Sequence, residues 1–288
     1  MVSTILNLLF LFNFLFSQFY QDPLSSKLLF FVEKNEKCPA IALKSLFSKQ
    51  EDLIGNIFLV YNYAEIYNFT GNQYFFLKAK KNLNCLAENL EKINDSDPLI
   101  KATYNLALLN YMLKTGDPSN LPVFRNISSN ETFTKIREMR FLVREFLLFN
   151  NTKSLEEAEA LSEEVAKSVD TTYKSLDLMR ARCELFNAKR IKKGVEILSD
   201  DVEINYSYNI LKFEDFPFIL DNFKYVLALD ECNKMLNIKK IENSIKNRLI
   251  FLGLFTHPIE GGICENIICK RTLSLNSELL TLFIKYDV

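Results

Sequence analysis

Residues 60–98 read VYNYAEIYNFTGNQYFFLKAKKNLNCLAENLEKINDSDP, and this stretch decides the fold. Large apolar residues recur every three or four positions up to Tyr67, which is the period of one face of an α-helix. Gly71 interrupts the pattern, and a second apolar face then begins with Ala79 and Leu83. The stretch therefore predicts two amphipathic helices joined by a turn at the glycine.

The spacing of helix breakers extends this prediction to the whole chain. The 288 residues include only 7 Gly and 7 Pro, and neither type occurs between Pro122 and Gly194. A sheet protein would need turn residues at much shorter intervals. Because 48% of the residues are hydrophobic, there is ample material for a core. We expect an all-α protein.

Local signals place the predicted helices along the chain. Asp97 and Pro98 are typical of the N-cap and first position of a helix, which Gly116 would end. Ser154 and Glu157 predict a capping box at the start of another helix. The predicted helices lie near 26–33, 39–50, 52–70, 73–93, 98–114, from 132 and from 154 onward, within 178–198, and at 216–236, 238–254 and 276–286. We expect three parts: an apolar N-terminal segment (1–21), a helical array (22–254), and a C-terminal loop with a capping helix (255–288).

The apolar N-terminus allows two interpretations. Residues 5–16 are almost wholly apolar, and no charged side chain precedes Asp22. The run has the length of a signal-peptide h-region, with Ser17 as a small residue at a possible cleavage site, but it lacks the usual basic n-region. Alternatively it is a first helix buried between its neighbours.

Sequons and cysteines bear on the same question. The six Asn-X-Ser/Thr sequons exceed the roughly three expected by chance in a chain this rich in asparagine, which favours glycosylation. They lie at Asn68, Asn94, Asn126, Asn130, Asn150 and Asn205. Six cysteines are also present, at Cys38, Cys85, Cys183, Cys232, Cys264 and Cys269. Because Cys85 and Cys183 sit in apolar helical patterns, we expect them to be small core residues rather than disulfide partners.

Charge and residue types exclude several classes of function. The 35 Lys and Arg balance 36 Asp and Glu, whereas general nucleic-acid binders carry a clear positive excess. Any RNA contact would rest on two basic clusters, which are otherwise solvated helix faces. The first consists of Lys189, Arg190, Lys192 and Lys193, and the second is a looser group of Lys239, Lys240, Lys246 and Arg248.

Catalytic and metal sites are not predicted. The single histidine, His257, has no evident partner, and Cys264 and Cys269 alone do not supply the four ligands of a zinc site. No glycine-rich phosphate loop occurs. We therefore predict a protein that is not an enzyme and that needs neither a metal nor another cofactor.

The helical pattern over about residues 52–200 resembles the tetratricopeptide repeat (TPR) family, although Ala79 follows Gly71 by eight positions where that repeat has five. The resemblance implies an α-solenoid of stacked antiparallel hairpins, whose concave face binds a partner.

Two narrower resemblances follow from the order of features. The segments Tyr63–Gly71, Asn105–Asn110, Phe133–Leu148 and Ala181–Leu198 resemble the TPR subunit of the signal recognition particle, without that family's Lys-rich C-terminal tail. This resemblance implies a partner protein in the groove and contact with the particle's RNA. The segment from Leu155 to Leu198 is similar to the epsilon subunit of coatomer.

From these patterns we expect a scaffold subunit that binds another protein in a concave groove. The predicted groove residues combine aromatic area with polar groups that set register; they are Asn62, Tyr63, Tyr67, Asn105 and Asn110. The expected location is the cytoplasm. The alternative is a secreted or lumenal helical glycoprotein, if residues 1–17 are a cleaved signal peptide.

Overall fold

The structure is a computed structural model, and it describes residues 24–36, 50–125, 127, 129–193, 219–257, 260–265 and 269–288. Within these ranges the chain forms helices and connecting loops, apart from one isolated backbone pairing of Thr256 with Ile263. The predicted all-α class is confirmed. The expected segment 1–21 and nearly all of the helix expected at 39–50 lie outside the described residues. The helices are α2 (Leu24–Asn35), α4 (Gln50–Thr70), α5 (Gln73–Ala87), α6 (Leu90–Asn94), α7 (Pro98–Thr115), α8 (Thr132–Phe149), α9 (Thr152–Ser168), α10 (Thr172–Lys193), α12 (Ile219–Leu236), α13 (Lys239–Gly253) and α14 (Leu273–Tyr286).

Three of the predicted helix boundaries are confirmed in atomic detail. Gly71 adopts a left-handed backbone (φ 67°) between α4 and α5, a conformation that costs glycine little. Asp97 caps α7, because its side chain accepts a hydrogen bond from the Leu99 N–H at 2.8 Å. Gly116 (φ 70°) ends the same helix. Such glycines and N-cap residues can be recognised in the sequence because they act on helix ends only a few residues away.

The capping box predicted at the start of α9 is wrong. The helix begins at Thr152, and Asn151 occupies its N-cap without a side-chain hydrogen bond. Ser154 is buried, and its hydroxyl donates to the carboxylate of Glu145 on α8 instead. Ser154 therefore bonds a residue of the neighbouring helix instead of capping the start of its own helix.

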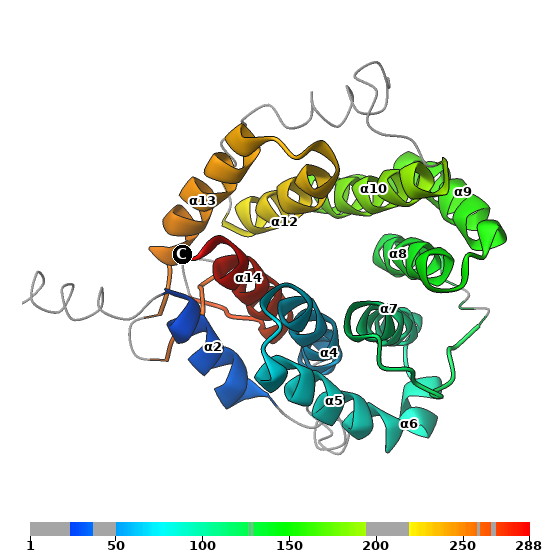
Figure 1. Cartoon of the computed structure of the whole chain (residues 1–288), viewed down its shortest axis with the longest axis horizontal. Coiled ribbons are helices and arrows are strands. Elements are labelled where there is room, and N and C mark those ends of the chain that lie inside the picture. The colour runs from blue at the N-terminus through cyan, green and yellow to red at the C-terminus, as the bar shows by residue number, and fades with distance from the viewer. Residues whose placement is uncertain are drawn as a thin grey trace, which may run out of the picture.

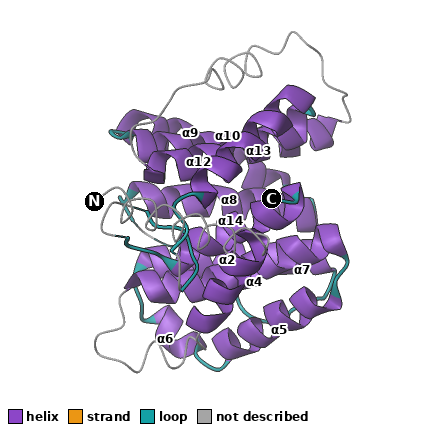
Figure 2. Cartoon of the chain, turned by 90° about the vertical axis from the view of Figure 1, so that its left-hand side faces the viewer, coloured by secondary structure: helices purple, strands orange, loops and turns teal. Residues whose placement is uncertain are grey.

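The helices close into a ring (Figure 1). The inner helices α4, α7, α8, α10, α12 and α14 pack in chain order, and α14 then packs against α4. Outside them, α5 covers α4, α9 covers α8, α13 covers α12 and α2 covers α14. In Figure 2, turned by 90°, helices such as α5 and α7 are seen from the side and run from one side of the molecule to the other. The expected terminal capping helix therefore lies against the first long helix rather than at the free end of an array.

A close crossing permits this closure. A Cβ atom placed on Gly55 of α4 would lie 2.9 Å from Leu273 Cβ and 3.0 Å from Ser274 N at the start of α14. Only glycine fits such an approach without a shift of one helix. Asn62 Nδ2 donates to Ser277 Oγ across the same pair of helices at 2.8 Å. The contact between α4 and α14, which are far apart in the sequence, is thus both apolar and polar.

Disulfides add to this packing and correct one expectation. Cys183 on α10 and Cys232 on α12 are both fully buried and form a disulfide between two inner helices. Cys264 pairs with Cys269 in the loop before α14, and Cys85 is also disulfide-bonded. The expectation that Cys85 and Cys183 are unpaired core residues is wrong, because α10 and α12, distant in sequence, bring two apolar cysteines together.

Among the described helices, none combines the length and the apolar character needed to cross a membrane.

Candidate functional site

The ring interior contains charged stripes on neighbouring helices. Arg137, Arg140 and Arg144 follow one another at spacings of three and four on α8, so they share one face of that helix. On α10 the same spacing places Asp177, Arg180 and Glu184 on one face. The two helices pack against each other, and the stripes bring opposite charges together.

Glu184 is at the centre of the first ion cluster. Its carboxylate accepts hydrogen bonds from Arg140 Nη2 at 2.7 Å and from Arg144 Nη1 at 3.1 Å. Both guanidinium groups also donate to the Tyr61 hydroxyl of α4, at 3.1 and 3.0 Å. Arg144 further donates to Asn110 Oδ1 of α7 at 3.0 Å. Residues of four helices thus meet in one network.

The network holds its carboxylate ionised. Burial alone would raise the pKa of Glu184, but Arg140 and Arg144 outweigh it and keep that pKa well below its ordinary value. The Arg140 and Glu184 side chains are each about 1% exposed. A buried carboxylate held this strongly by two cations is suited to orient other groups and unsuited to donate a proton at neutral pH.

Further ion pairs join α10 to α12 and α14. Arg180 pairs with Glu278 of α14, and Lys224 of α12 pairs with Asp177 at 3.1 Å. All four side chains are buried. Burial alone would raise the pKa of Glu278, but mainly Arg180 and Lys224 lower it to about 2.

A polar cavity opens at one end of this interior. It measures about 230 Å³ and is lined by residues of α4, α7, α10, α12 and α14, among them Glu65, Arg180 and Glu278. In the described part of the chain, two buried atoms of its lining residues have no hydrogen-bond partner: Glu65 Oε1 and Arg180 Nε. Buried polar groups are usually paired, so these two atoms are exceptional.

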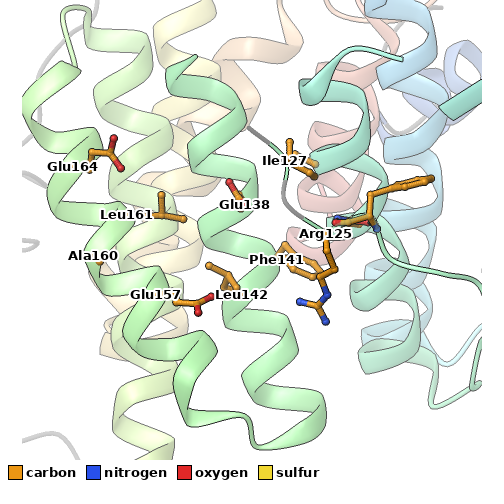
Figure 3. A pocket seen from close by; sticks show the side chains of 12 residues that line it. Arg125, Ile127, Glu138, Phe141, Leu142, Glu157, Ala160, Leu161 and Glu164 are labelled. Carbon is orange, nitrogen blue, oxygen red and sulfur yellow. Dashed lines mark hydrogen bonds between the residues drawn. The ribbon is translucent and has the colours of Figure 1, made fainter. Parts of the chain in front are cut away.

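A second hollow, here called the lateral groove, lies on the outside of the ring (Figure 3). It measures about 390 Å³ and runs between α8, α9 and the loop that precedes α8. Phe141, Leu142 and Leu161 form an apolar floor, and three carboxylates border it, those of Glu138, Glu157 and Glu164. Partial burial and the nearby Glu157 raise the pKa of Glu138, although Lys135 opposes the shift.

The five predicted groove residues do not share one surface. Asn62 and Asn110 face the ring interior, where the former lines the polar cavity and the latter holds Arg144. Tyr63 is buried beside Phe75 of α5, and its hydroxyl donates to Glu36 at 3.2 Å. Ring closure covers Asn62, which contacts Ser277 of α14, whereas Tyr63 is covered by α5 of its own hairpin and Asn110 by the neighbouring helix α8.

The remaining two residues lie elsewhere. Tyr67 packs against Phe76 of α5, with ring centroids 5.4 Å apart. Asn105 is buried, and its amide exchanges two hydrogen bonds with the Phe124 backbone, at 2.7 and 2.9 Å. Asn105 thereby fixes the loop that forms one side of the lateral groove, which it also lines.

The other singled-out residues have local roles. In the first basic cluster, Lys189 at the end of α10 forms an ion pair with Glu159 of α9. Nδ1 of His257 accepts a hydrogen bond from the Glu260 N–H at 3.2 Å within the C-terminal loop. Across the part of the chain that the structure describes, no three His, Cys, Asp or Glu side chains are grouped so as to hold a metal ion.

The described sequon asparagines are all exposed. Asn68, Asn94, Asn130 and Asn150 lie at helix ends or in loops, whereas nine other asparagines of the described chain are buried. Asn126 and Asn205 lie outside the described residues. The four described sequons are therefore accessible to a glycan.

Sequence reasoning missed the charged interior. The available signal was the matched spacing of three and four on α8 and α10, with opposite charges in register. A second signal was α12, where Lys224, Asp230 and Glu231 stand among apolar residues on a helix buried on all sides. Because such a helix has no face exposed to solvent, its charged side chains must form ion pairs with other buried groups.

Comparisons with protein-family models, with curated proteins and with solved structures find no match to this chain.

Proposed function

We propose that this protein works outside the reducing cytosol, as a disulfide-bonded helical glycoprotein with a binding rather than a catalytic role. The observation that carries the proposal is the buried disulfide between Cys183 and Cys232. Structural disulfides persist in secretory and extracellular compartments and are rare where glutathione keeps thiols reduced. Because this one joins two inner helices of the ring, it belongs to the core.

Two further features support the same compartment. The four described sequon asparagines are exposed, as glycosylation requires. The apolar run at residues 5–16 has the length of a signal-peptide h-region. These features favour the secreted or lumenal alternative over the cytoplasmic one.

The cytosolic assemblies are correspondingly less favoured. The TPR subunit of the signal recognition particle and the epsilon subunit of coatomer both imply a reducing environment. The stacked hairpins α4–α5 and α8–α9 are consistent with a TPR-like arrangement, but the return of α14 to α4 is foreign to an open solenoid. RNA contact through the basic clusters stays a prediction with no added support.

We infer that the partner is a protein segment and that it binds in the lateral groove. The floor is apolar, and the charged border residues are three carboxylates and one cation, Arg125, which is paired with Glu145. The border is therefore acidic on balance, and the complementary segment carries Lys or Arg beside a large apolar residue. Glu138 forms no ion pair among the described residues, unlike Glu164, which pairs with Lys135 at 2.8 Å. Glu138 is therefore the carboxylate with a charge to offer a ligand.

The compartment is tested on protein purified from eukaryotic cells without reductant. We expect no alkylation of thiols when the protein is unfolded in denaturant without reductant, and a loss of mass on enzymatic removal of N-glycans. Asn130→Gln should remove one glycan, whereas Asn120→Gln, also exposed in the same loop but outside any sequon, should remove none. Reactive thiols at Cys183 and Cys232, together with an unglycosylated chain, would overturn the proposal.

The groove is tested with an array of synthetic peptides that vary in basic and apolar residues. We expect preferred binding of peptides that combine both, weakened by salt. Glu138→Gln should reduce this binding, and Glu163→Gln, exposed on α9 outside the groove lining, should leave it unchanged. Equal binding of acidic peptides would refute this part of the proposal.

A further inference from the structure

The polar cavity inside the ring has the features of a binding site. Glu65 of α4, Arg180 of α10 and Glu278 of α14 meet there, so the site exists only because the ring closes. Its volume of about 230 Å³ is many times the roughly 10–15 Å³ that a single water needs. A small organic molecule fits this space, whereas a peptide segment does not.

The unpaired atoms define what the cavity lacks. Glu65 has one oxygen near Lys114, 3.6 Å away, while its other oxygen, Oε1, has no partner among the described residues. Arg180 donates to Glu278 through Nη1, while its Nε has no partner there. Glu65 and Arg180 are only 8% and 7% exposed. Leaving a buried donor and a buried acceptor unsatisfied is costly, which indicates that a ligand completes them.

The two residues present fixed charges of opposite sign. Burial alone would raise the pKa of Glu65, but Lys234 and Lys114 lower it to about 2, so the carboxylate is ionised at any physiological pH. Burial favours the neutral form of Arg180, and Glu278 favours the charged form. Each charged group has one atom in an ion pair and one atom without a partner among the described residues.

We propose that this cavity binds a small zwitterion of amino-acid size, whose ammonium group meets Glu65 and whose carboxylate meets Arg180. Leu227 and Leu282 also line the cavity and provide apolar contact for an aliphatic side chain. A charge-assisted hydrogen bond at each end gives the ligand one orientation. The inference is independent of the compartment and of the lateral groove.

The mouth of the cavity adds a second feature. Asn68 lines it, is exposed and belongs to a sequon, so a glycan attached there would stand beside the entrance. Ligand binding is therefore measured on the glycosylated protein and on the Asn68→Gln variant in parallel. Binding by either form supports the site.

The experiment measures thermal unfolding and calorimetric binding with a panel of amino acids at equal millimolar concentrations. Methylamine, acetate and sorbitol serve as ligands with one charge or none. We expect at least one amino acid to raise the unfolding midpoint by about 5 °C near saturation, with no comparable effect of the three controls.

Variants locate the binding. Thr281 lines the cavity and is half-buried, so Thr281→Met should fill the space and abolish binding, whereas Thr281→Val, of similar size to threonine, should retain it. Glu65→Gln should weaken binding about ten-fold or more, because it removes one charge and keeps the shape. Circular dichroism of each variant confirms that it folds.

Three outcomes would overturn the proposal. If sorbitol stabilised the protein as strongly as any amino acid does, the cavity would not select ligands by their charge. Unchanged binding in Thr281→Met would place the ligand elsewhere. No binding by any amino acid to either glycoform, together with a Thr281→Met variant more stable than the parent, would mean that the cavity holds solvent alone.

Discussion

Replacing Glu184 by glutamine should strongly destabilise this protein. The substitution keeps the shape of the side chain and removes its charge. Two guanidinium groups, those of Arg140 and Arg144, then remain in the ring interior without their shared counter-ion. Their side chains are about 1% and 5% exposed, so water cannot replace the lost carboxylate without a rearrangement of the helices.

The magnitude follows from the cost of an uncompensated buried charge. Breaking a buried ion pair by removing one partner typically costs about 3–5 kcal/mol. The glutamine carbonyl can still accept one hydrogen bond, but its NH₂ group is a donor and would face a guanidinium group, which is also a donor. We therefore expect a loss of about 4 kcal/mol in the free energy of unfolding.

The assay is urea unfolding near pH 7 with the disulfides intact. The chain has 12 Tyr and no Trp, so tyrosine fluorescence and circular dichroism are the two probes, and their transitions should coincide. Glu164→Gln is the matched control, because Glu164 is 57% exposed and its ion pair with Lys135 should be worth less than about 1 kcal/mol.

A second variant separates charge from shape. In the Glu184→Gln background, Arg140→Met should cost less than it does in the parent, because it removes one of the two unpaired charges. A loss below about 1 kcal/mol for Glu184→Gln, or additive effects in this cycle, would refute the reasoning. Either result would mean that the interior is hydrated.

Other predictions test the acid response, the ring closure and the disulfide. The pKa values of Glu65 and Glu278 are lowered from 4.5 to about 2, so their stabilisation is complete above about pH 4.5 and is lost as the pH falls towards 2. Each contributes about 3 kcal/mol, and urea midpoints that stay constant between pH 5 and pH 3 would contradict this. Gly55→Ala should lower the thermal midpoint, because a strain of about 1–3 kcal/mol against α14 outweighs the helical gain of about 1 kcal/mol; a rise in the midpoint would show that α14 is free to move. Replacing both Cys183 and Cys232 by alanine opens a loop with a sequence separation of 49 and should cost about 4 kcal/mol in urea unfolding, whereas an unchanged midpoint would contradict a structural role.

The sequence predicted the helices well where their signals are local. The predicted 52–70, 98–114 and 238–254 correspond to α4 (Gln50–Thr70), α7 (Pro98–Thr115) and α13 (Lys239–Gly253). Periodicity and caps act between residues that are at most four apart, so they can be read along the chain. The capping box at Ser154 failed because a residue of another helix competed for its hydroxyl.

The candidate sites were mostly beyond sequence reasoning. Tyr63 and Tyr67 of α4 were expected to bind a partner. Both pack instead against α5, where Tyr63 contacts Phe75 and Tyr67 contacts Phe76. The polar cavity needs Glu65 and Glu278 side by side, and no local rule relates residues so far apart. Lateral-groove residues such as Glu138 and Leu161 come from neighbouring helices and carry no distinctive spacing.

By itself, then, the sequence determined that the chain is helical, where most helices begin and end, and which asparagines could carry glycans. Only the tertiary structure decided that the array closes, that Cys183 meets Cys232, and that Glu184 is buried between two arginines. The physical reason is the range of the forces. Backbone hydrogen bonds and caps are settled within a turn or two of helix, whereas ring closure depends on whether α14 can approach α4 closely at Gly55, which is a property of two helix surfaces together.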